Sequence, residues 1–559
     1  MDKDKIKLLL ISTFNIQNFA NYLNNDESTP EINAKVTTFG QVIPTLLDNQ
    51  INKDDSDGAV VWTQPDLLIE SFNKQLGNEK ILIDDVLNEV NTFADAVISF
   101  SKKMNYLFIP TWSIPPYYRG YGLLDFRNNL GVSNTLSRMN LRLADKFEES
   151  NNIYMIDSSR ILINAGANAQ NPKLWYMGKI PYSNEVFKNV KEEIKSAIDS
   201  IGGNTKKLII LDLDDTLWGG IVGDVGWENL QLGGHDHIGE AFSDFQKALK
   251  SLTKKGILLA IVSKNEESTA LNAIKNNPEM VLKLDDFVSY RINWDDKAQN
   301  ISEILNELNL GAQSAVFLDD NPVERSRVND ALPEIFVPEL PVNKLFYKSF
   351  LLDLKCFDSP SVTNEDINRT KLYLAKKQRE SLKSNLGSVL DWLESLKTEV
   401  KIDEVNKGNL QRTVQLLNKT NQMNLSTRRM SEAELLNWLD ADYTKMWVFT
   451  VSDKFSDSGL TGMISLEITE GTGQIVDFIL SCRVMGRNIE ELMVYKVYDY
   501  AKQSGLNQLK AKFIETAKNK PCFHFWKNLS NFEYFEKGNI FYFDLTNKYP
   551  RPAHITIIE

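Results

Sequence analysis

Side chains suited to phosphate chemistry stand at the ends of short apolar runs in the middle of this 559-residue sequence. Three carboxylates follow the apolar run of KLIILDLDDT, of which the first two form a D-x-D pair, and a serine ends the next run, ILLAIVS. A lysine opens the polar stretch KAQNI, and two more carboxylates follow the run AVFL. The set consists of Asp212, Asp214, Ser263, Lys297, Asp319 and Asp320.

Each residue type in this set has a role in phosphoryl transfer. Several carboxylates together form a hard oxygen site that suits Mg²⁺, which prefers to share its coordination shell with a phosphate. The ion would reduce repulsion among the acids and keep Asp212 ionised as a nucleophile. Asp214 is placed to protonate a leaving group and later to activate water. The Ser263 hydroxyl and the Lys297 ammonium would hold phosphoryl oxygens, so the set predicts an aspartyl-phosphate mechanism.

The elements around these residues must bring them to one place. Apolar runs at 208–211, 257–262 and 315–318 alternate with helix-period segments, which predicts a parallel α/β sheet in residues 201–345. In such a sheet, ligands bind outside the carboxyl ends of the strands. A single D-x-D pair after a strand is usually a helix cap or a solvated turn. Several chemical groups at successive element ends, in a consistent order, favour a shared site instead.

The same stretches resemble a known family. DLDDT, the serine of IVSKN, Lys297 and FLDDN look like the four motifs of the haloacid dehalogenase (HAD) superfamily, which contains Mg²⁺-dependent phosphatases and phosphotransferases. LDLDDTLWGGIVGDVG and FLDDNPVERSRV resemble its FkbH-like branch, HAD subfamily IIIC. The resemblance implies a Rossmann-like core with Asp212 as nucleophile and Asp214 as acid/base. It also implies Mg²⁺ ligands from Asp212, Asp319, Asp320 and the Asp214 carbonyl.

The spacing of the first two motifs limits what can cover the site. A cap domain of substantial size would need more residues than lie between Thr216 and the strand that ends at Ser263. The glycine-rich stretch TLWGGIVGDVGWENLQLGG and one helix fill that interval. We therefore expect an open site, which suits a bulky substrate or a partner protein.

Residues 1–200 form a first α/β block, in which apolar runs again alternate with helical stretches. This block resembles the degenerate SGNH-hydrolase-like domain that precedes the HAD unit in some FkbH-like proteins. A Ser-His-Asp hydrolase needs an imidazole, yet the histidines are His235, His237, His524 and His554, so none lies in this block. We expect no catalytic triad here; binding, docking and purely structural roles stay open.

Residues 346–398 read as a helical connector, and residues 399–559 form a third block of another kind. MWVFTVSD, GLTGMISLEI and GQIVDFILSC predict consecutive antiparallel strands, followed by a helix at 488–503 and a strand near 508–514. The segment RVMGRN resembles the R-x-x-G-x-G loop of GNAT acyltransferases. That resemblance implies binding of acyl-CoA, or of a phosphopantetheine arm, by Arg483, Gly486, Arg487 and Asn488. A GNAT-shaped structural or docking unit is the alternative.

Composition narrows the choice of partner and compartment. The net charge is −12, and no dense run of lysine and arginine stands out, so nucleic acid and anionic membranes are poor candidates. No stretch approaches the roughly 18–20 apolar residues of a membrane span. The three cysteines, Cys356, Cys482 and Cys522, are far apart, which argues against a disulfide framework. We therefore expect a cytoplasmic protein.

These observations predict an α/β multidomain enzyme with an HAD core flanked by SGNH-like and GNAT-like domains. The predicted activity is Mg²⁺-dependent phosphoryl transfer. The resemblance implies an acyl phosphate substrate such as 1,3-bisphosphoglycerate, with glyceryl transfer to an acyl carrier protein or a sugar in polyketide or polysaccharide biosynthesis. A simple phosphomonoester phosphatase acting on small molecules, and a non-catalytic multidomain scaffold, are the alternatives.

Overall fold

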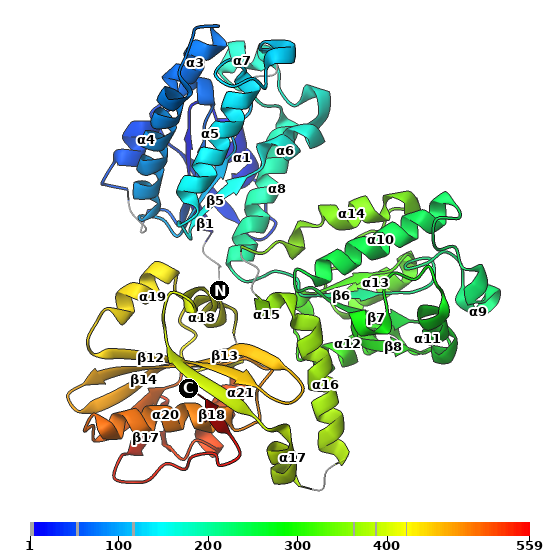
Figure 1. The fold of residues 1–559 in the computed structure, drawn as a ribbon, viewed down its shortest axis with the longest axis vertical. Coiled ribbons are helices and arrows are strands. Elements are labelled where there is room, and N and C mark those ends of the chain that lie inside the picture. Colours follow the sequence, from blue (N-terminus) through cyan, green and yellow to red (C-terminus); the bar gives the residue numbers. More distant parts are fainter. Residues whose placement is uncertain are drawn as a thin grey trace. The chain divides into compact units, whose positions relative to one another are not determined.

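The computed structural model describes residues 5–51, 55–114, 118–360, 364–385, 388–420 and 422–558. The chain folds into two compact units, Met1–Asp199 and Ser200–Glu559. Helices and strands alternate along both of them, which confirms the predicted α/β multidomain class (Figure 1). The finer division of the second unit near residues 345 and 398 stays a prediction. None of the helices in the described ranges combines the length and hydropathy that a membrane span requires.

The first unit is built on a parallel sheet with the strand order β2-β1-β3-β4-β5. β3 and β4 are buried at every position, because a doubly wound sheet has helices on both faces. The strands are β1 (Ile6–Ser12), β2 (Ile32–Val36), β3 (Gly58–Trp62), β4 (Tyr106–Pro110) and β5 (Ile153–Ile156). The helices are α1 (Gln17–Asn24), α2 (Val42–Leu47), α3 (Glu70–Leu76), α4 (Ile83–Ser101), α5 (Val132–Phe147), α6 (Ser158–Ala165), α7 (Pro172–Gly178) and α8 (Asn184–Ile201).

The second unit begins with another parallel sheet, whose strand order is β8-β7-β6-β9. The chain therefore moves outward from β6 to β8 and then crosses back to place β9 on the other side of β6. The strands are β6 (Leu208–Leu211), β7 (Leu258–Ser263), β8 (Phe287–Ile292) and β9 (Ala315–Leu318). The helices are α9 (Val222–Val225), α10 (His237–Thr253), α11 (Glu267–Asn276), α12 (Lys297–Leu308), α13 (Pro322–Ala331) and α14 (Tyr347–Asp353).

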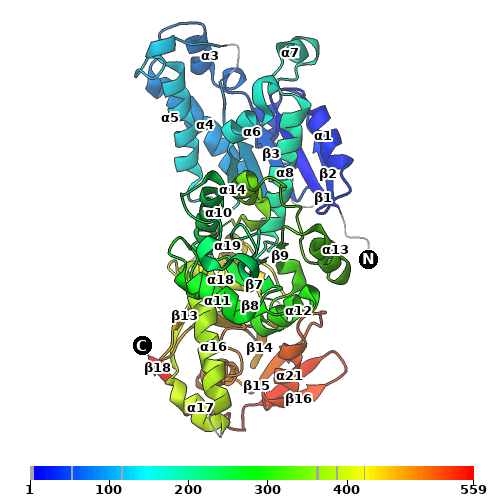
Figure 2. The same cartoon turned by 90° about the vertical axis from the view of Figure 1, so that its right-hand side faces the viewer.

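Alternate residues of these strands enter two separate cores. Ile209 and Leu211 pack with side chains of α10, α11 and α14, and α10 and α14 lie side by side in both views (Figures 1 and 2). Leu208 and Ile210 pack with side chains of α12 and α13 on the opposite face. All four positions of β6 are buried, as expected of a central parallel strand. Its carboxyl end is therefore held rigidly from both faces.

The segment 346–398, expected to be a connector, begins with α14, which packs in the core of the preceding sheet. It continues with α15 (Asn364–Ile367), α16 (Arg369–Asn385) and α17 (Val389–Leu396) and leads into a mixed sheet. The sheet has the order β16-β17-β15-β14-β13-β12-β10-β18, with β11 beside β14. Its strands are β10 (Glu399–Glu404), β11 (Met423–Asn424), β12 (Thr444–Ser452), β13 (Asp457–Thr469), β14 (Thr472–Leu480), β15 (Gln508–Lys512), β16 (Glu533–Phe535), β17 (Ile540–Asp544) and β18 (Thr556–Ile558). Its helices are α18 (Leu410–Lys419), α19 (Glu432–Leu439), α20 (Ile489–Gln503) and α21 (Lys520–Asn528).

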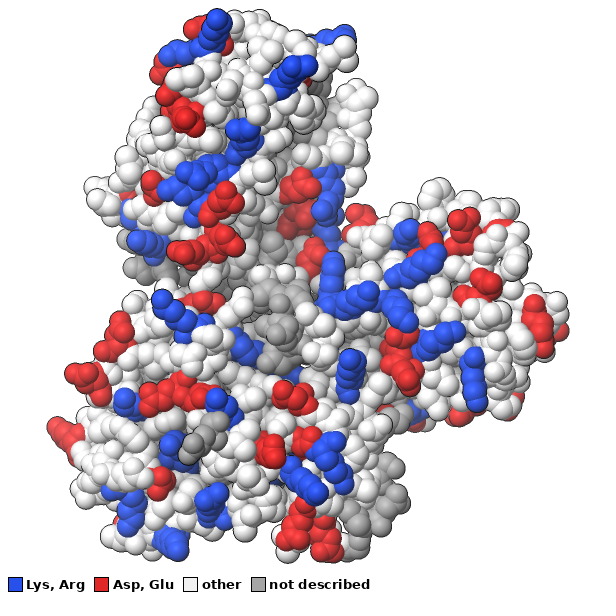
Figure 3. Space-filling view, viewed as in Figure 1, with Lys and Arg blue, Asp and Glu red and all other residues white. Residues whose placement is uncertain are grey.

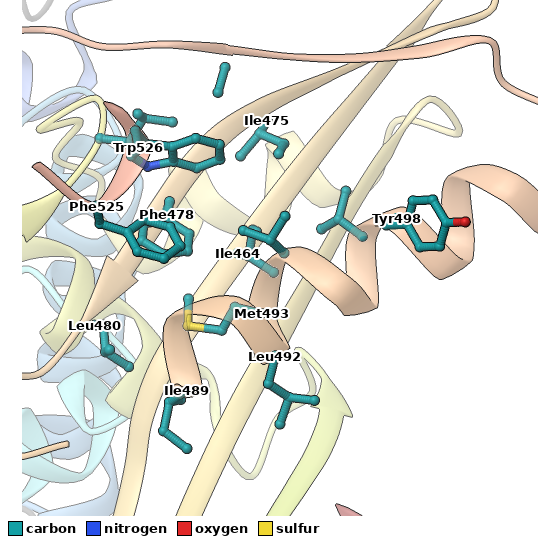
Figure 4. Packing of buried hydrophobic residues seen from close by; sticks show 14 of the residues in the cluster. Ile464, Ile475, Phe478, Leu480, Ile489, Leu492, Met493, Tyr498, Phe525 and Trp526 are labelled. Atoms are coloured by element: carbon teal, nitrogen blue, oxygen red, sulfur yellow. The ribbon is translucent and has the colours of Figure 1, made fainter. Parts of the chain in front are cut away.

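The predicted antiparallel run over β12, β13 and β14 is confirmed, but the next strand differs. β15 pairs with β14 in parallel, because α20 carries the chain back along the sheet before β15 begins. Ile489, Leu492 and Met493 on α20 pack against the apolar face of β13 and β14 (Figure 4). On the same face, Phe478 stacks on Phe525 of α21 with ring centroids 5.2 Å apart. The region thus has a core of its own.

Candidate active site

The carboxyl ends of β6 and β9 meet at the edge where the site residues gather. The two strands are neighbours, and the Asp212 N–H donates to the carbonyl of Leu318, the last residue of β9, at 3.0 Å. After β6 the chain crosses one face of the sheet through α10, and it reaches β9 across the opposite face through α12. Such a switch in strand order opens a crevice at the carboxyl edge of an α/β sheet. Asp212 and Asp319 are therefore placed side by side by topology alone.

A buried ammonium joins these two carboxylates. Lys297, the first residue of α12, places its Nζ 3.0 Å from Asp212 Oδ2 and 2.6 Å from Asp319 Oδ2. The three residues are 3%, 7% and 0% exposed, respectively. The sequence-based expectation that Asp212, Lys297 and Asp319 share one site agrees with this geometry. Their contact is a charged cluster shielded from water, where Coulomb interactions are strong.

One lysine does not neutralise two buried carboxylates. Burial, and then repulsion from Asp212, raises the pKa of Asp319 to about 6, although the Lys297 ammonium opposes that rise. For Lys297, burial opposes the charged form, but the attraction of Asp212 and Asp319 outweighs burial and raises the pKa. Burial also raises the pKa of Asp320, against the pull of Lys344. The cluster therefore keeps excess negative charge, which a bound cation would offset.

The donor set fits a divalent metal. Asp212, Asp319 and Asp320 each offer a carboxylate oxygen, and these oxygens lie within 4.8 Å of one another. Among the described residues, no group hydrogen-bonds Asp212 Oδ1, although this oxygen is buried. A buried carboxylate oxygen without a partner is costly unless a cation binds it. Oxygen donors of this kind suit Mg²⁺, as the sequence predicted. The part expected of the Asp214 carbonyl stays a prediction.

Asp214 and Ser263 are linked through a side chain that the motif comparison did not single out. Asn265, two positions after Ser263, donates from Nδ2 to Asp214 Oδ2 at 2.9 Å, and its Nδ2 lies 3.3 Å from Ser263 Oγ. Ser263 and Asn265 are buried, and Ser263 ends β7, the strand on the other side of β6. Asp214 thus lies at the same edge as Asp212, and its role as acid/base stays a prediction.

Two further residues contact the site: Lys344, which has no signal in the sequence, and Thr216, the last residue of DLDDT. Lys344 Nζ donates to the carbonyl of Asp215 at 2.7 Å and lies 3.5 Å from Asp320 Oδ2. The Asp320 N–H donates to Thr216 Oγ1 at 3.2 Å. Lys344 belongs to none of the four motifs, and α13 and a loop separate it from Asp320 along the chain. Only the fold brings it back to the carboxyl edge.

The site carries no inserted domain. Residues 217–257, all of which the structure describes, contain α9, a short turn and α10 before β7 begins. α10 packs on the sheet through Phe242, Phe245 and Leu249, so it belongs to the core and does not cover the site. This agrees with the expected open site.

On the face shown in Figure 3, acidic and basic side chains are interspersed, without one large basic patch.

The loop predicted to bind an acyl arm, residues 483–488, lies directly before α20. It belongs to residues 399–559, which we call the third region. Asn488 adopts a left-handed conformation directly before the helix, and Gly486 also has positive φ. The Gly486 N–H donates to Glu490 Oε1 at 2.9 Å, and the Arg487 guanidinium pairs with Asp453 inside the protein. Arg483 Nε lies 3.2 Å from Ser481 Oγ. The structure brings the four residues together, and their binding of CoA stays a prediction.

A short strand lies where β14 and β15 part. β14 pairs with β15 only from Thr472 to Ile475, and farther along β11 pairs with the end of β14. The Leu425 N–H donates to the Phe478 carbonyl at 3.2 Å, and the Leu425 carbonyl accepts from the Ile514 N–H at 3.0 Å. Asn519 Nδ2 also donates to the Asn424 carbonyl at 3.0 Å. β11 therefore bridges the two diverging strands.

Known proteins resemble parts of this chain. No protein-family model matches the sequence, and no curated protein matches it. The N-terminal part of the protein BF1531 from Bacteroides fragilis, which contains a phosphatase domain and was solved with Mg, is 28% identical; the match covers 64% of this chain and 95% of that chain, with a TM-score of 0.58.

Two acetyltransferases match a smaller part. The ribosomal-protein-S18-alanine N-acetyltransferase from Escherichia coli is 8% identical, over 26% of this chain and 94% of its own, with a TM-score of 0.20. The PaiA N-acetyltransferase from Thermoplasma acidophilum, solved with coenzyme A, is 16% identical, over 26% and 96%, with a TM-score of 0.21. Over 64% of its length this chain is similar to a Mg-complexed phosphatase structure, and its carboxylate cluster fits that likeness.

Proposed function

We propose that the chain is a Mg²⁺-dependent phosphatase or phosphotransferase of the HAD type that works through an aspartyl-phosphate on Asp212. The observation that carries this proposal is the state of the Asp212 carboxylate. One of its oxygens is held by Lys297, and the other is buried without a hydrogen-bond partner among the described residues, next to Asp319 and Asp320. The likeness to a phosphatase domain solved with Mg supports it.

The proposed reaction has two balanced steps. An Asp212 oxygen attacks phosphorus, the bond from phosphorus to the leaving oxygen breaks, and Asp214 gives that oxygen a proton. Water then transfers a proton to Asp214 and attacks the phosphorus, which releases phosphate and restores Asp212. Ser263 and Lys297 hold phosphoryl oxygens during both steps. Mg²⁺ bound by Asp212, Asp319 and Asp320 would offset the charge between the nucleophile and the phosphate.

The substrate class we propose is an acyl phosphate such as 1,3-bisphosphoglycerate. Cleavage between phosphorus and oxygen phosphorylates Asp212 and releases a free carboxylate. If a thiol attacks the carbonyl carbon instead, the bond from carbon to oxygen breaks, a thioester forms and inorganic phosphate leaves. The second route is acyl transfer, with a glyceryl group passing to an acyl carrier protein or, through a hydroxyl, to a sugar. The absence of an inserted domain between Thr216 and Ser263, in a stretch fully described, favours such large acceptors.

The third region has a proposed part in that second route. A loop before a helix, with glycine and arginine, is suited to a pyrophosphate or phosphate, so the arm of acyl-CoA or of a carrier would bind near Arg483 and Gly486. A simple phosphomonoester phosphatase, or a scaffold that only binds partners, remains the alternative. A scaffold predicts no Mg²⁺-dependent turnover of an aryl phosphate.

The first test is capture of the phosphoenzyme. The full-length chain is incubated with p-nitrophenyl phosphate and Mg²⁺, quenched in acid and analysed by peptide mass spectrometry. We expect the mass of one phosphoryl group on the peptide that contains Asp212. Asp212→Asn should lose the adduct and at least ~10³-fold in rate, whereas Asp224→Asn, the same change at an exposed position of α9, should keep both. Unchanged turnover in Asp212→Asn would end the proposed mechanism.

The second test distinguishes the two ways of breaking an acyl phosphate. The reaction runs in ¹⁸O-labelled water, with and without a phosphopantetheinylated carrier protein. Hydrolysis through aspartyl-phosphate places the label in phosphate and leaves the carboxylate unlabelled. Acyl transfer yields a thioester on the carrier and unlabelled phosphate. Label in the carboxylate alone would contradict both routes.

A further inference from the structure

The carboxylate of Asp214 is held on both of its oxygens by groups of its own chain. Oδ1 accepts from the Trp218 indole N–H at 2.8 Å and from the Val222 N–H at 3.1 Å. Oδ2 accepts from Asn265 Nδ2 at 2.9 Å. We call Trp218, the Val222 N–H and Asn265 the Asp214 clamp. A carboxylate bonded on both oxygens has one preferred orientation.

The clamp is buried and built into the loop that follows β6. Trp218 is fully buried and Asn265 is 5% exposed, so water has little access to either donor. The loop is fixed by paired bonds between Gly219 and Gln231 at 3.0 and 2.9 Å. A Cβ added at Gly219 would lie 2.8 Å from Gln231 Oε1, so glycine is what lets the loop pack this closely. The loop therefore fixes the position of the Trp218 indole.

Packing alone does not explain this choice of residues. A phenylalanine would fill much of the same core volume without an N–H that has to be satisfied inside the protein. Asn265 bonds Asp214 and also lies 3.3 Å from Ser263 Oγ, so one amide connects the predicted acid/base with the predicted phosphate-binding hydroxyl. Both side chains direct their buried N–H donors to groups of the site.

We propose that Trp218 and Asn265 are positioning residues that hold the Asp214 carboxylate in the orientation required for proton transfer, while the site is open. The proposal rests on the proposed phosphoryl transfer and adds how the acid/base is oriented. Where a closing domain orders a catalytic group only after the substrate binds, the clamp orders it beforehand. It follows that substrates too large to be enclosed, including one attached to a protein, meet an acid/base that is already aligned.

The main experiment compares two tryptophans of the same loop. Trp218→Phe removes the indole N–H that reaches Asp214, and Trp227→Phe makes the same change where no contact with a site carboxylate exists among the described residues. With p-nitrophenyl phosphate and Mg²⁺, we expect Trp218→Phe to lower kcat about 10- to 100-fold and KM in parallel, with kcat/KM within about twofold, because the variant slows hydrolysis of the phosphoenzyme and general acid–base catalysis is worth about 10²–10⁴. The phosphoenzyme should accumulate, because its hydrolysis depends on Asp214.

A double-mutant cycle shows whether Trp218 acts through Asp214. In an Asp214→Asn background, Trp218→Phe should cause little further loss of kcat, because the oriented group is already gone. Equal losses in both backgrounds would overturn the positioning role and leave Trp218 as a core residue. Asn265→Asp should be worse than Asn265→Ala, since a second carboxylate would then face Asp214 in place of a donor. The reverse order would count against the clamp.

A readout independent of turnover separates the clamp from the proposed function. In the protein labelled with ¹⁵N-tryptophan, Trp218→Phe identifies the indole N–H signal of Trp218. That signal should move upfield in Asp214→Ala and stay in place in Asp224→Ala; an unmoved signal would refute the contact. If the wild-type chain forms no phosphoenzyme at all, the proposed function fails. If it does, and Trp218→Phe behaves like Trp227→Phe, only the clamp fails.

Discussion

Asp212, Asp319 and Lys297 show at the scale of single residues why the site needs a further cation. Two buried carboxylates share one ammonium, and the Asp320 carboxylate beside them has the Lys344 ammonium 3.5 Å away and the Thr216 hydroxyl 3.4 Å away. Acids in such a position are neutralised by a proton or by a metal. The stability of the metal-free protein should therefore depend on pH.

Asp319 sets the sign of that dependence. Its pKa is raised from 3.8 to about 6, so between these values the folded protein keeps a proton that the unfolded chain has released. The contribution of Asp319 to the free energy of unfolding therefore falls as pH rises from about 4 to 6, by at most about 3 kcal/mol. Without Mg²⁺, Asp319→Asn should gain stability over the wild type across this window, measured by urea unfolding with amide exchange at β6.

Mg²⁺ supplies the control for this prediction. At pH 7 the ion should stabilise the wild type and have much less effect on Asp319→Asn, because binding to the folded state alone raises the free energy of unfolding. A difference between the two proteins that is the same at pH 4 and pH 7 would contradict the assignment to Asp319.

Leu213, between the two acids, is fully buried with Ile209 and Leu211 on the face that packs against α10. This agrees with the alternation of side chains along an extended chain, which sends Asp212 the other way. Leu213→Ala should cost about 2–5 kcal/mol of stability. It should also lower kcat of the folded fraction, because the carboxylates on either side lose their support. A chemical denaturation curve and active-site titration measure the two effects separately.

How far the sequence predicts the site depends on where each residue stands. Asp212, Ser263, Lys297 and Asp319 were found because they flank strands or open a helix, and parallel strands end at one edge. Trp218 and Asn265 lie near motif residues, but a buried donor looks like an ordinary core or turn residue until its acceptor is known. Lys344 had no local signal at all, since its partners depend on how the chain returns to the edge.

At the scale of elements, some strands can be predicted from their own residues and others cannot. Buried strands such as β6 and β7 are continuous apolar runs, which the sequence displays directly. β2 has the weaker pattern INAKV, with exposed positions between buried ones, and it was not predicted. The parallel pairing of β15 was also missed, because direction depends on the crossover by α20 and not on the residues of β15 itself.

Helix α16 shows that the connector is more than a solvated spacer. Arg379 Nε lies 2.7 Å from Asp453 Oδ2, and Arg487 pairs with the same carboxylate, which is fully buried. Burial would raise the pKa of Asp453, but the two arginines, Arg379 first, lower it overall. The charged, polar sequence of α16 is typical of a solvated helix, but Arg379 departs from that pattern, because its side chain is 5% exposed.

Removing the Asp453 carboxylate should therefore lower the free energy of unfolding. Asp453→Ala leaves two buried guanidinium groups without their shared partner, and we expect a loss of about 3–5 kcal/mol. Asp440→Ala, an exposed position of the same region, should change stability by no more than about 0.5 kcal/mol. Thermal unfolding followed by amide exchange in β12 and β13 reports on this region. Equal effects of the two substitutions would contradict a structural role for the ion-pair cluster.

At the scale of the whole molecule, the described site residues all belong to the unit Ser200–Glu559. The first unit has its own sheet and its own core, with Phe72, Val90 and Phe108 fully buried. We therefore expect residues 200–559, expressed alone, to turn over p-nitrophenyl phosphate with kcat/KM within about threefold of the full chain, since each unit has a separate core. Loss of more than tenfold, in a fragment with a normal unfolding curve, would mean that the first unit contributes to the reaction.

β11 has a consequence for any extended ligand of the third region. It already pairs with the backbone at the end of β14 and, through Leu425, with Ile514 just after β15. Because β11 is joined covalently to α18, it competes as a tethered ligand at an effective concentration of about millimolar or higher. If the proposed acyl arm pairs with the same backbone groups, free CoA at lower concentration would rarely displace β11. The arm of a docked carrier protein would also be tethered, so the proposed delivery by a carrier would overcome this competition more easily than capture from solution.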